Sequence, residues 1–494
     1  MNFTRNRARR AGASPFLSRE LGATLLAPLV AGSFALCIVA FTTKANQAPQ
    51  AAASPAVGAS SSAKVSVPRL DLRDMKLDNG LRVILVPDHS APVYSIDVAY
   101  NVGSRNEPPG HTGYAHLFEH MMFQGSQNVG KGEHFVLVLN NGGNMNGTTT
   151  EDRTTYFEEL PKNQLDLGLF LESDRMRALN ITQANLDNQR NAVQEERRQG
   201  IDNQPYGRAE LDIDSLAYDN FAYKHSTIGS MADLDVASID DVKDFFRIYY
   251  APNNAVLTLV GDFDPDDALA RIKKYFGSIP SQPAPPKVDL AEETHYGERS
   301  ETIYDPLARQ PRIYVAYHIP PGNTPETYAA IQLAMILGEG QSSRLYQHLV
   351  KDKQLATQIS VDPDSRMGPG LLYITATPRP GVKMEDLQKG IDDELAAAAT
   401  DGITPEELAK AKTRLLRGFV DQRRSSLNTA IRIGDDVVKY GDPNLINTQL
   451  DKENAVTLDQ VNAAAKKFLV RDQRAIVITL PASQDPTGAK KVAQ

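Results

Sequence analysis

The segment His111–His120 reads HTGYAHLFEH, and it contains three of the nine histidines in this 494-residue chain. It ends in the pattern His-x-x-Glu-His, formed by His116, Glu119 and His120. The pattern of residues 115–123 predicts a helix, on which side chains four residues apart project from one face. His116 and His120 are therefore placed to bind a single metal ion, and their imidazole nitrogens suit zinc.

Glu119 lies beside this face, too close in sequence to His116 to be a comfortable third ligand. Its carboxylate is expected to reach a metal-bound water, whose pKa a zinc ion lowers from about 15.7 to about 7. We therefore predict that Glu119 is the general base. The alternative is two surface histidines and an acid on an ordinary helix, but chance yields this pattern only about 0.02 times in such a composition. A conventional zincin is excluded because its motif runs His-Glu-x-x-His.

The third ligand is expected from a helix predicted over residues 185–199, which carries the adjacent acids Glu195 and Glu196. Leu186, Val193 and Glu196 fall on one helix face, whereas Glu195 shares its side with polar residues. This periodicity favours Glu196 as the ligand. The competing interpretation is that Glu196 pairs with a nearby arginine in solvent.

Strands and helices are mixed along the chain without a strict alternation. Residues 80–86 and 93–102 alternate apolar and polar side chains, which is typical of strands. Residues 385–400 and 405–424 are rich in Ala, Leu, Glu and Lys, which predicts long helices. This mixture favours an α+β fold over a doubly wound parallel sheet.

An internal duplication is indicated by two similar segments, 238–261 and 457–481. Each begins with a Ser or Thr that can cap a helix, continues with a helical pattern and ends in a strand. We expect two related α/β units, although such helix-strand pairs are common enough for coincidence to remain an alternative.

The domain boundaries follow from shifts in composition. Residues 279–288 (IPSQPAPPKV) contain four prolines, which interrupt both helix and strand patterns. Residues 46–66 are rich in Ala, Ser and Pro and are typical of a flexible tether. The predicted organisation is a signal peptide or membrane anchor at 1–45, a linker at 46–69, a zinc-binding domain at 70–278, a linker at 279–291, a second domain without metal at 292–482, and a tail at 483–494.

The N-terminal segment is typical of an exported protein. Basic residues precede an uncharged, mostly apolar run over residues 21–41, which would act as a signal peptide cleaved after Ala45 or as an uncleaved anchor. We expect a periplasmic location, with a possible membrane tether. The only cysteine, Cys37, lies inside this run, so a cleaved chain would form no disulfide. The net charge of −8 disfavours nucleic acid as a partner.

A substrate-binding strand is predicted after the metal helix, within residues 141–161 (NGGNMNGTTTEDRTTYFEELP). Gly142 and Gly143 permit the close approach of another backbone, so an extended peptide could add as a further strand. An ordinary hairpin is the alternative.

These motifs resemble the pitrilysin/insulinase family of zinc metallopeptidases, which includes the mitochondrial processing peptidases. The inverted His-x-x-Glu-His motif matches, and so does Asn-Ala-Val-x-x-Glu, which ends at Glu196. The resemblance implies that His116, His120 and Glu196 bind zinc and that Glu119 is the base. It also implies two α/β roll domains forming half of a clamshell around a chamber for short or unfolded peptides.

The same resemblance assigns a substrate-binding edge strand, in which Asn146 holds a substrate carbonyl and Gly143 and Asn144 lie nearby. One departure is that many members have an acid where this chain has Gln189. We expect Gln189 to orient a neighbouring ligand by hydrogen bonding, which would leave a tuned and functional metal site.

A second departure concerns an Arg-x6-Tyr pair that binds the substrate carbonyl in family members with a complete site. The aligned positions here are Val350 and Thr357, neither of which can do this. Arg344 and Tyr346 are nearby substitutes, but at i and i+2 they face different sides of a helix. The resemblance therefore implies a heterodimer in which a related subunit supplies the pair. A non-catalytic structural or assembly subunit of the same fold is the alternative to a peptidase.

Overall fold

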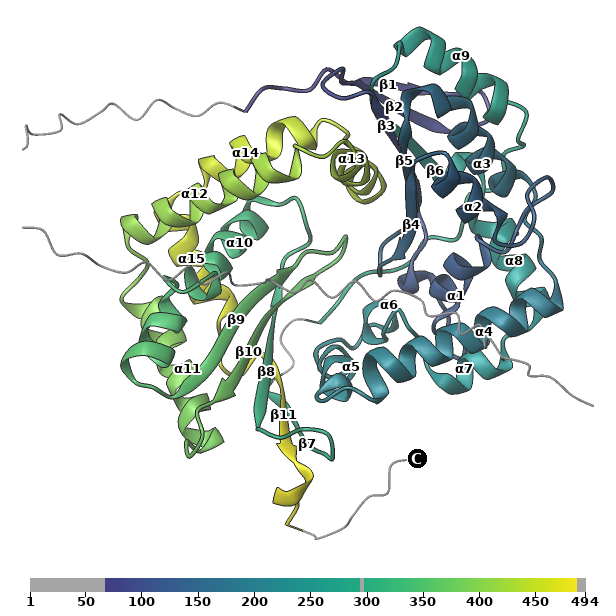
Figure 1. The fold of residues 1–494 in the computed structure, drawn as a ribbon. Coiled ribbons are helices and arrows are strands. Elements are labelled where there is room, and N and C mark those ends of the chain that lie inside the picture. The colour runs from purple at the N-terminus through teal and green to yellow at the C-terminus, as the bar shows by residue number, and fades with distance from the viewer. Residues whose placement is uncertain (1–66, 294–296, 487–494) are drawn as a thin grey trace, which may run out of the picture. The chain divides into compact units, whose positions relative to one another are not determined.

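The computed structural model describes residues 67–293 and 297–486, which hold two β-sheets surrounded by helices (Figure 1). The predicted signal segment, most of the first linker and most of the C-terminal tail lie outside these residues. Within the described part of the chain, no helix is both long and apolar enough to cross a membrane.

The first sheet has six strands in the order β1-β2-β6-β3-β5-β4. Strands β2 and β6 run parallel, and the other neighbouring pairs are antiparallel. Strand β4 therefore lies at one edge of the sheet. The bounds are β1 (Arg73–Lys76), β2 (Arg82–Pro87), β3 (Val93–Tyr100), β4 (Asn144–Thr149), β5 (Thr154–Pro161) and β6 (Ala255–Gly261).

The second sheet repeats this arrangement with the order β7-β11-β8-β10-β9. Its β7 and β11 are parallel, as β2 and β6 are, and its other pairs are antiparallel. The matching order and directions confirm the predicted duplication. The bounds are β7 (Arg299–Asp305), β8 (Arg312–Ile319), β9 (Ala356–Asp364), β10 (Gly370–Pro378) and β11 (Arg474–Pro481).

The helices divide between the two halves of the chain, which we call the first half (residues 67–278) and the second half (residues 299–486). The first half contains α1 (Tyr114–Met121), α2 (Glu133–Asn140), α3 (Leu165–Arg177), α4 (Gln183–Arg197), α5 (Gly207–Ala217), α6 (Phe221–Lys224), α7 (Met231–Val236), α8 (Ile239–Tyr249) and α9 (Pro265–Phe276). The second half contains α10 (Pro325–Gly338), α11 (Met384–Thr400), α12 (Pro405–Gln422), α13 (Ser426–Tyr440), α14 (Leu445–Ala455) and α15 (Leu458–Phe468).

The two segments that suggested a duplication fold alike. Ser238 caps α8 through a capping box with Asp241, and Thr457 caps α15 through a capping box with Gln460. In each box two backbone N–H groups at the helix start gain side-chain acceptors, which fixes where the helix begins. Strands β6 and β11 then follow and take equivalent places in the two sheets.

One helix from each half packs against the sheet of the other half. On β2, Val83 and Leu85 join the core of the first half, whereas Ile84 and Val86 point the other way and pack with Ile433 and other apolar residues of α13. Helix α5 covers the second sheet in the same manner, through a shared apolar cluster with β8, β10 and β11. Both sheets lie in one compact unit of the chain, and their faces are buried partly across the two halves.

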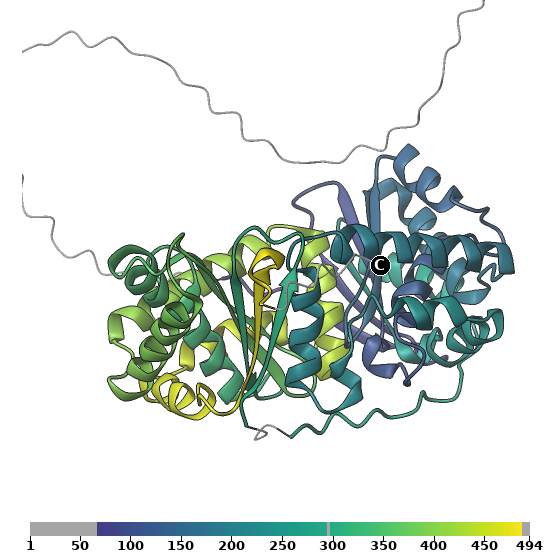
Figure 2. The same ribbon diagram turned by 90° about the horizontal axis from the view of Figure 1, so that it is seen from below.

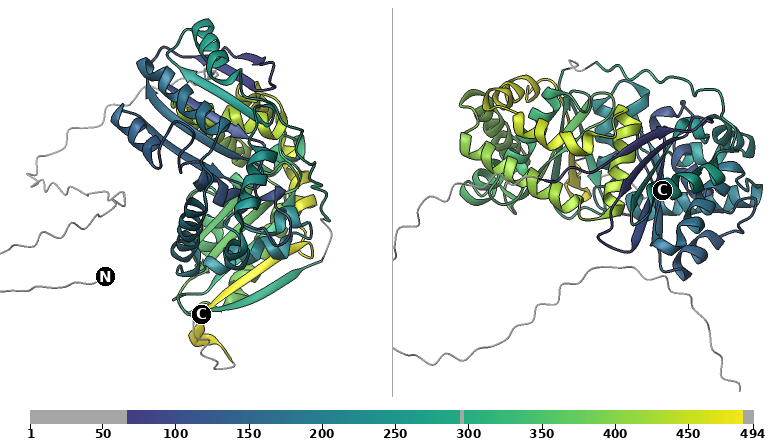
Figure 3. Two further views of the ribbon diagram at one scale, coloured as in Figure 1. Left: turned by 90° about the vertical axis from the view of Figure 1, so that its right-hand side faces the viewer. Right: turned by 90° about the horizontal axis from the view of Figure 1, so that it is seen from above.

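Residues 279–293 contain no helix or strand, in line with the proline-rich composition of the predicted linker. Figure 2 shows this segment as an extended coil that runs along one side of both halves, and Figure 3 shows it again from above. The domain boundaries proposed from composition remain predictions.

Candidate metal centre

Helix α1 is fixed at its N-terminus by a buried carboxylate. Gly113 precedes the helix with a φ of 88°, a backbone conformation that favours glycine. The Glu107 carboxylate accepts hydrogen bonds from the N–H groups of Gly113 (2.9 Å) and Ala115 (2.7 Å), and it contacts His225 Nε2 at 3.0 Å. Glu107 thus satisfies donors that a helix start leaves without partners and holds α1 in place.

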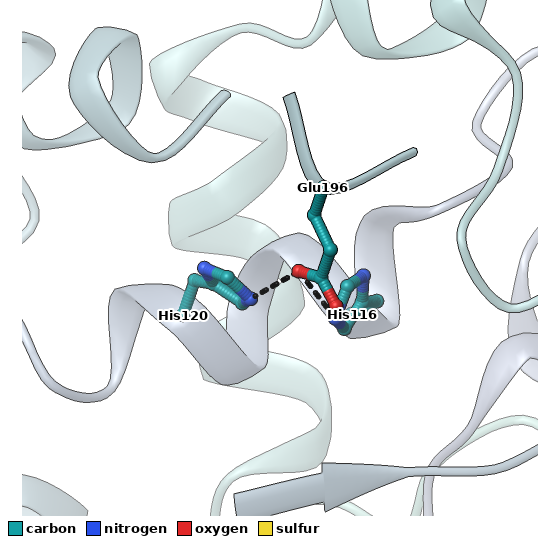
Figure 4. A group of neighbouring side chains, drawn as sticks. All are labelled: His116, His120 and Glu196. Atoms are coloured by element: carbon teal, nitrogen blue, oxygen red, sulfur yellow. Dashed lines mark ion pairs between the residues drawn. The ribbon is translucent and has the colours of Figure 1, made fainter. Parts of the chain in front are cut away.

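The two histidines of the motif face one carboxylate. Their rings lie 4.8 Å apart, centre to centre, nearly at right angles. One oxygen of Glu196, near the end of α4, lies 3.3 Å from His120 Nε2 and 3.7 Å from His116 Nε2 (Figure 4). The structure therefore brings together the three residues that the sequence proposes as ligands.

Glu195 and Glu196 differ in direction rather than in burial. Helical periodicity placed Glu196 on the more inward face of the helix, yet the side chains of Glu195 and Glu196 are 54% and 53% exposed. Both lie at the end of α4, over an open site, where periodicity no longer separates buried from exposed positions. Glu195 contacts Arg198 and Gln199 instead of the histidines.

The pKa values of His116 and Glu196 are shifted toward the forms that bind a metal, whereas that of His120 is shifted toward its protonated form. Burial, reinforced by His120, lowers the pKa of His116 to about 4. The hydrogen bond to His120 is the main cause that lowers the pKa of Glu196. Burial opposes protonation of His120, but the hydrogen bond and charge of Glu196 outweigh it and raise the pKa of His120. Neutral imidazole and ionised carboxylate are the forms that bind metals.

The donor set fits zinc. Two imidazole nitrogens and one carboxylate oxygen lie within 4.8 Å of one another. Three protein ligands of this kind, with a fourth position open, are typical of catalytic zinc sites. His120 Nδ1 lies 3.3 Å from Gln189 Oε1, so Gln189 makes the contact expected of a residue that orients a ligand.

Glu119 contacts strand β4. It is 8% exposed and accepts a hydrogen bond of 2.6 Å from Thr149 Oγ1. Gly147 lies against it, since a Cβ there would be 3.1 Å from Glu119 Cγ. Burial raises the pKa of Glu119, and the Thr149 hydrogen bond acts against this. The sequence reasoning missed Thr149 and Gly147, because their contact depends on how β4 packs on α1.

Comparisons with known proteins agree with this geometry. Residues 82–230 match the family model for insulinase, peptidase family M16, and residues 237–415 match the model for the peptidase M16 inactive domain. Zinc protease PqqE of Helicobacter pylori is 31% identical over 415 residues, which cover 83% of this chain and 93% of that protein. The chain belongs to the M16 peptidase family.

Comparison with solved structures confirms the fold. The crystal structure of a protease from Helicobacter pylori has a TM-score of 0.80 and 29% identity, covering 84% of this chain and 100% of that one. The first half of the periplasmic protease PqqL from Escherichia coli has a TM-score of 0.68 and 20% identity, covering 84% and 93%. A chain of Complex III2 from Candida albicans has a TM-score of 0.69 at 15% identity, covering 83% and 96%. The predicted α+β fold of two duplicated roll domains, half of an M16 clamshell, is confirmed.

In this M16 fold, strand β4 presents an open edge beside the metal centre. No other strand of the described residues pairs with its outer edge. Asn144 and Asn146 are exposed there, and Asn146 Oδ1 accepts a hydrogen bond from the N–H of Gly147. Gly143, just before β4, lies so close to Leu160 and the Glu159 carbonyl that a side chain would clash. The edge therefore has the backbone groups that an added strand would need.

The positions aligned with the missing Arg/Tyr pair cannot serve a substrate in this chain. Val350 is buried in the core of the second half, and the Thr357 hydroxyl donates to the Thr377 carbonyl. Arg344 is held by a two-point hydrogen-bonded ion pair with Glu407, at 2.9 and 2.7 Å. Arg344 is thus engaged within the second half.

A second group of possible metal-ligand atoms, which the sequence reasoning assigned to no site, consists of His134, Glu158 and Glu172. All three are buried, and His134 Nε2 lies 2.5 Å from Glu158 Oε1. Arg175 donates two hydrogen bonds to Glu172. The donor atoms of this group are therefore largely engaged with one another and with a buried guanidinium.

Proposed function

We propose that the chain is a zinc-dependent endopeptidase that hydrolyses short or unfolded peptides. The main observation behind this proposal is that the ligand atoms of His116, His120 and Glu196 lie close together. The Glu119 carboxylate comes from the same helix as the two histidines. The relatives named zinc proteases support it.

His116, His120 and Glu196 would hold the zinc ion. A bound zinc ion would supply Lewis acidity, acidifying a water molecule and polarising the scissile carbonyl. Glu119 would take the proton from that water and later deliver it to the leaving amine. Its hydrogen bond to Thr149 holds the carboxylate in place and counters the rise in pKa that burial causes, which keeps Glu119 available as a base.

The substrate would bind as an extended strand along β4. Main-chain hydrogen bonds to this edge would give affinity that depends little on sequence, and the Asn146 side chain would hold a substrate carbonyl. Such binding requires a flexible peptide, so folded proteins would resist cleavage. Gln189 would orient His120 through the contact between His120 Nδ1 and Gln189 Oε1.

Full activity would require a second subunit of related fold. Val350 and Thr357 leave this chain without the arginine and tyrosine expected opposite the zinc, and Arg344 is bound to Glu407. A heterodimer, with the pair supplied by the partner, is the arrangement that we favour. The match covers 48% of the full PqqL chain of Escherichia coli, so about half of that chain lies outside it. We propose a periplasmic location for the exported chain.

A second candidate function is that of a non-catalytic subunit. The match of residues 237–415 to the M16 inactive domain and the absence of an arginine at position 350 favour it. This candidate does not explain why His116, Glu119, His120 and Glu196 are all intact, because a non-catalytic subunit does not need them.

Hydrolysis of an unfolded peptide, followed with and without a chelator, tests the proposal. The chain would be assayed alone and with any co-purifying polypeptide. Activity that a chelator abolishes and zinc restores is expected, and it should be highest with the partner. A pure chain without metal or hydrolysis under all these conditions would favour the non-catalytic subunit. Full native activity of the chain alone would disprove the need for a heterodimer, and activity of a Val350→Arg, Thr357→Tyr variant alone would support it.

A further inference from the structure

The turn between β4 and β5 contacts the second half of the chain through consecutive residues. The Asp152 carboxylate accepts a hydrogen bond of 2.8 Å from the N–H of Met367, which precedes β10. One oxygen of Glu151 lies 3.7 Å from the buried Arg366 guanidinium. Asp152 is itself buried and binds Arg105 of the first half. The tip of this hairpin is thus anchored to residues more than 200 positions later in the chain.

Arg153, the next residue, makes the most direct connection. Its Nε donates to Asp435 Oδ1 on α13 at 3.1 Å, and its Nη1 donates to the Thr148 carbonyl on β4 at 2.9 Å and to the Thr148 hydroxyl. The Arg153 and Asp435 side chains are 11% and 21% exposed. Lys439 holds the other oxygen of Asp435 at 3.2 Å. One guanidinium therefore joins a helix of the second half to the strand beside the metal centre.

The strand that Arg153 holds also holds Glu119. Thr148, which accepts from Arg153, directly precedes Thr149, whose hydroxyl donates to Glu119. Gly147, which directly precedes Thr148, also lies against the Glu119 side chain. A displacement of Thr148 would therefore move both groups that fix the carboxylate of Glu119.

We propose that Arg153 and Asp435 are positioning residues for Glu119, so that the second half of the chain determines where the base of the first half lies. This inference rests on the proposed role of Glu119. The second half of the chain then contributes to catalysis through α13, without contacting the reacting atoms. A misplacement of about 1 Å at a catalytic group costs on the order of 10²-fold in rate, so a hydrogen-bonded connection of this kind has a measurable effect.

The test compares Arg153→Ala, Asp435→Ala and the double variant with the unaltered chain, each with its partner subunit if one is needed for activity. We expect kcat to fall about 10- to 100-fold, while KM and the zinc content per chain stay within twofold of those of the unaltered chain. Because both side chains act through one contact, the double variant should be no slower than the slower single variant. Arg153→Lys keeps a cation near Asp435 and should recover part of the loss.

Arg82→Ala is the matched control. Arg82 also joins the first sheet to α13, through a 2.9 Å hydrogen bond to the carbonyl of Gly441, the residue just after that helix, and it pairs with Asp74. It contacts neither β4 nor Glu119 among its hydrogen bonds, so its kcat should stay unchanged. An equal fall of kcat in Arg82→Ala would show general loosening of α13 and overturn the inference.

Asp435→Asn preserves shape and provides a second test if the alanine variants fail to fold. It should lower kcat in the same direction by a smaller factor, and an unchanged kcat in a folded Asp435→Asn variant would overturn the inference. An inactive Glu119→Gln variant beside a fully active Arg153→Ala variant would reject only the positioning role. A fully active Glu119→Gln variant would instead remove the proposed function on which that role rests.

Discussion

Two groups of histidine and glutamate in the first half have almost the same composition and opposite surroundings. The open cluster, His116, His120 and Glu196, has a half-exposed carboxylate and two imidazole nitrogens that face it. The closed cluster, His134, Glu158 and Glu172, is buried throughout. The buried Arg175 guanidinium adjoins it, donates twice to Glu172 and lies 4.5 Å from the centre of the Tyr156 ring.

This difference leads us to expect that counter-charge and access decide whether such a group binds a metal ion. In the closed cluster burial raises the pKa of Glu158 to about 7 and of Glu172 to about 8, so the group retains protons near neutral pH. In the open cluster the described structure shows no arginine or lysine ion pair to Glu196, and a metal ion would balance its charge. The distances between donor atoms alone would have treated the two groups alike.

The largest expected effect separates the clusters by metal content. We expect one zinc per chain, and His116→Ala, His120→Ala or Glu196→Ala should each bring it close to zero, because a catalytic site has only three protein ligands. His134→Ala, in the closed cluster, should retain the full zinc content. Elemental analysis after dialysis measures this.

Glu195→Ala is the control for Glu196→Ala, since the two acids are adjacent and equally exposed. It should keep its zinc. Two zinc ions per chain, with one lost in His134→Ala, would show that the closed cluster also binds metal and would remove the contrast between the clusters.

Next to the open cluster, Glu119→Gln should separate the role of base from that of ligand. It keeps the shape of the side chain and removes its basicity, so kcat should fall about 10²- to 10⁴-fold, with zinc content unchanged. Peptide hydrolysis and metal analysis on one preparation measure both. A metal-free Glu119→Gln chain would show that Glu119 is a ligand.

In the closed cluster the expected effect is on stability. Glu172→Ala leaves the buried Arg175 guanidinium without its hydrogen-bonded carboxylate, which should cost about 3–5 kcal/mol of unfolding free energy. Urea unfolding measures this loss, and the folded variant should keep its zinc. Asp393→Ala, which breaks an exposed pair with Lys389, should leave the unfolding midpoint in place. If both variants behaved alike, the closed cluster would have no special structural role.

The open cluster could be predicted because its information is local. His116 and His120 are related by one helical turn, and the capping residues Ser238 and Thr457 signalled the repeated helix-strand units. Glu196 was chosen by helical periodicity, which gave the residue that faces the histidines although it is as exposed as its neighbour Glu195. Local spacing therefore identified the elements and the ligand candidates.

The remaining contacts depend on how distant elements pack. Thr149 reaches Glu119 only because β4 lies beside α1, and Arg153 reaches Asp435 across 282 residues because α13 covers the first sheet. His134, Glu158 and Glu172 come from α2, β5 and α3 and share no spacing that a ligand motif would show. Without the strand order, no sequence pattern could join them.

The smallest expected effect is the pH dependence of the closed cluster. Between the ordinary glutamate pKa of 4.5 and the raised value of about 7, folded Glu158 holds a proton that the unfolded chain has released. Raising the pH through this window therefore destabilises the folded state, by up to about 1.4 kcal/mol per pH unit. Glu158→Gln removes this proton uptake and can still hydrogen-bond His134, so it should gain stability relative to the unaltered chain from pH 4.5 to 7. Urea midpoints at several pH values measure the difference, with Glu385→Gln, an exposed position on α11, as a control that should show no such drift. If the stability difference between Glu158→Gln and the unaltered chain did not change with pH, Glu158 would be ionised throughout. The closed cluster would then carry an unbalanced charge, as the open cluster does.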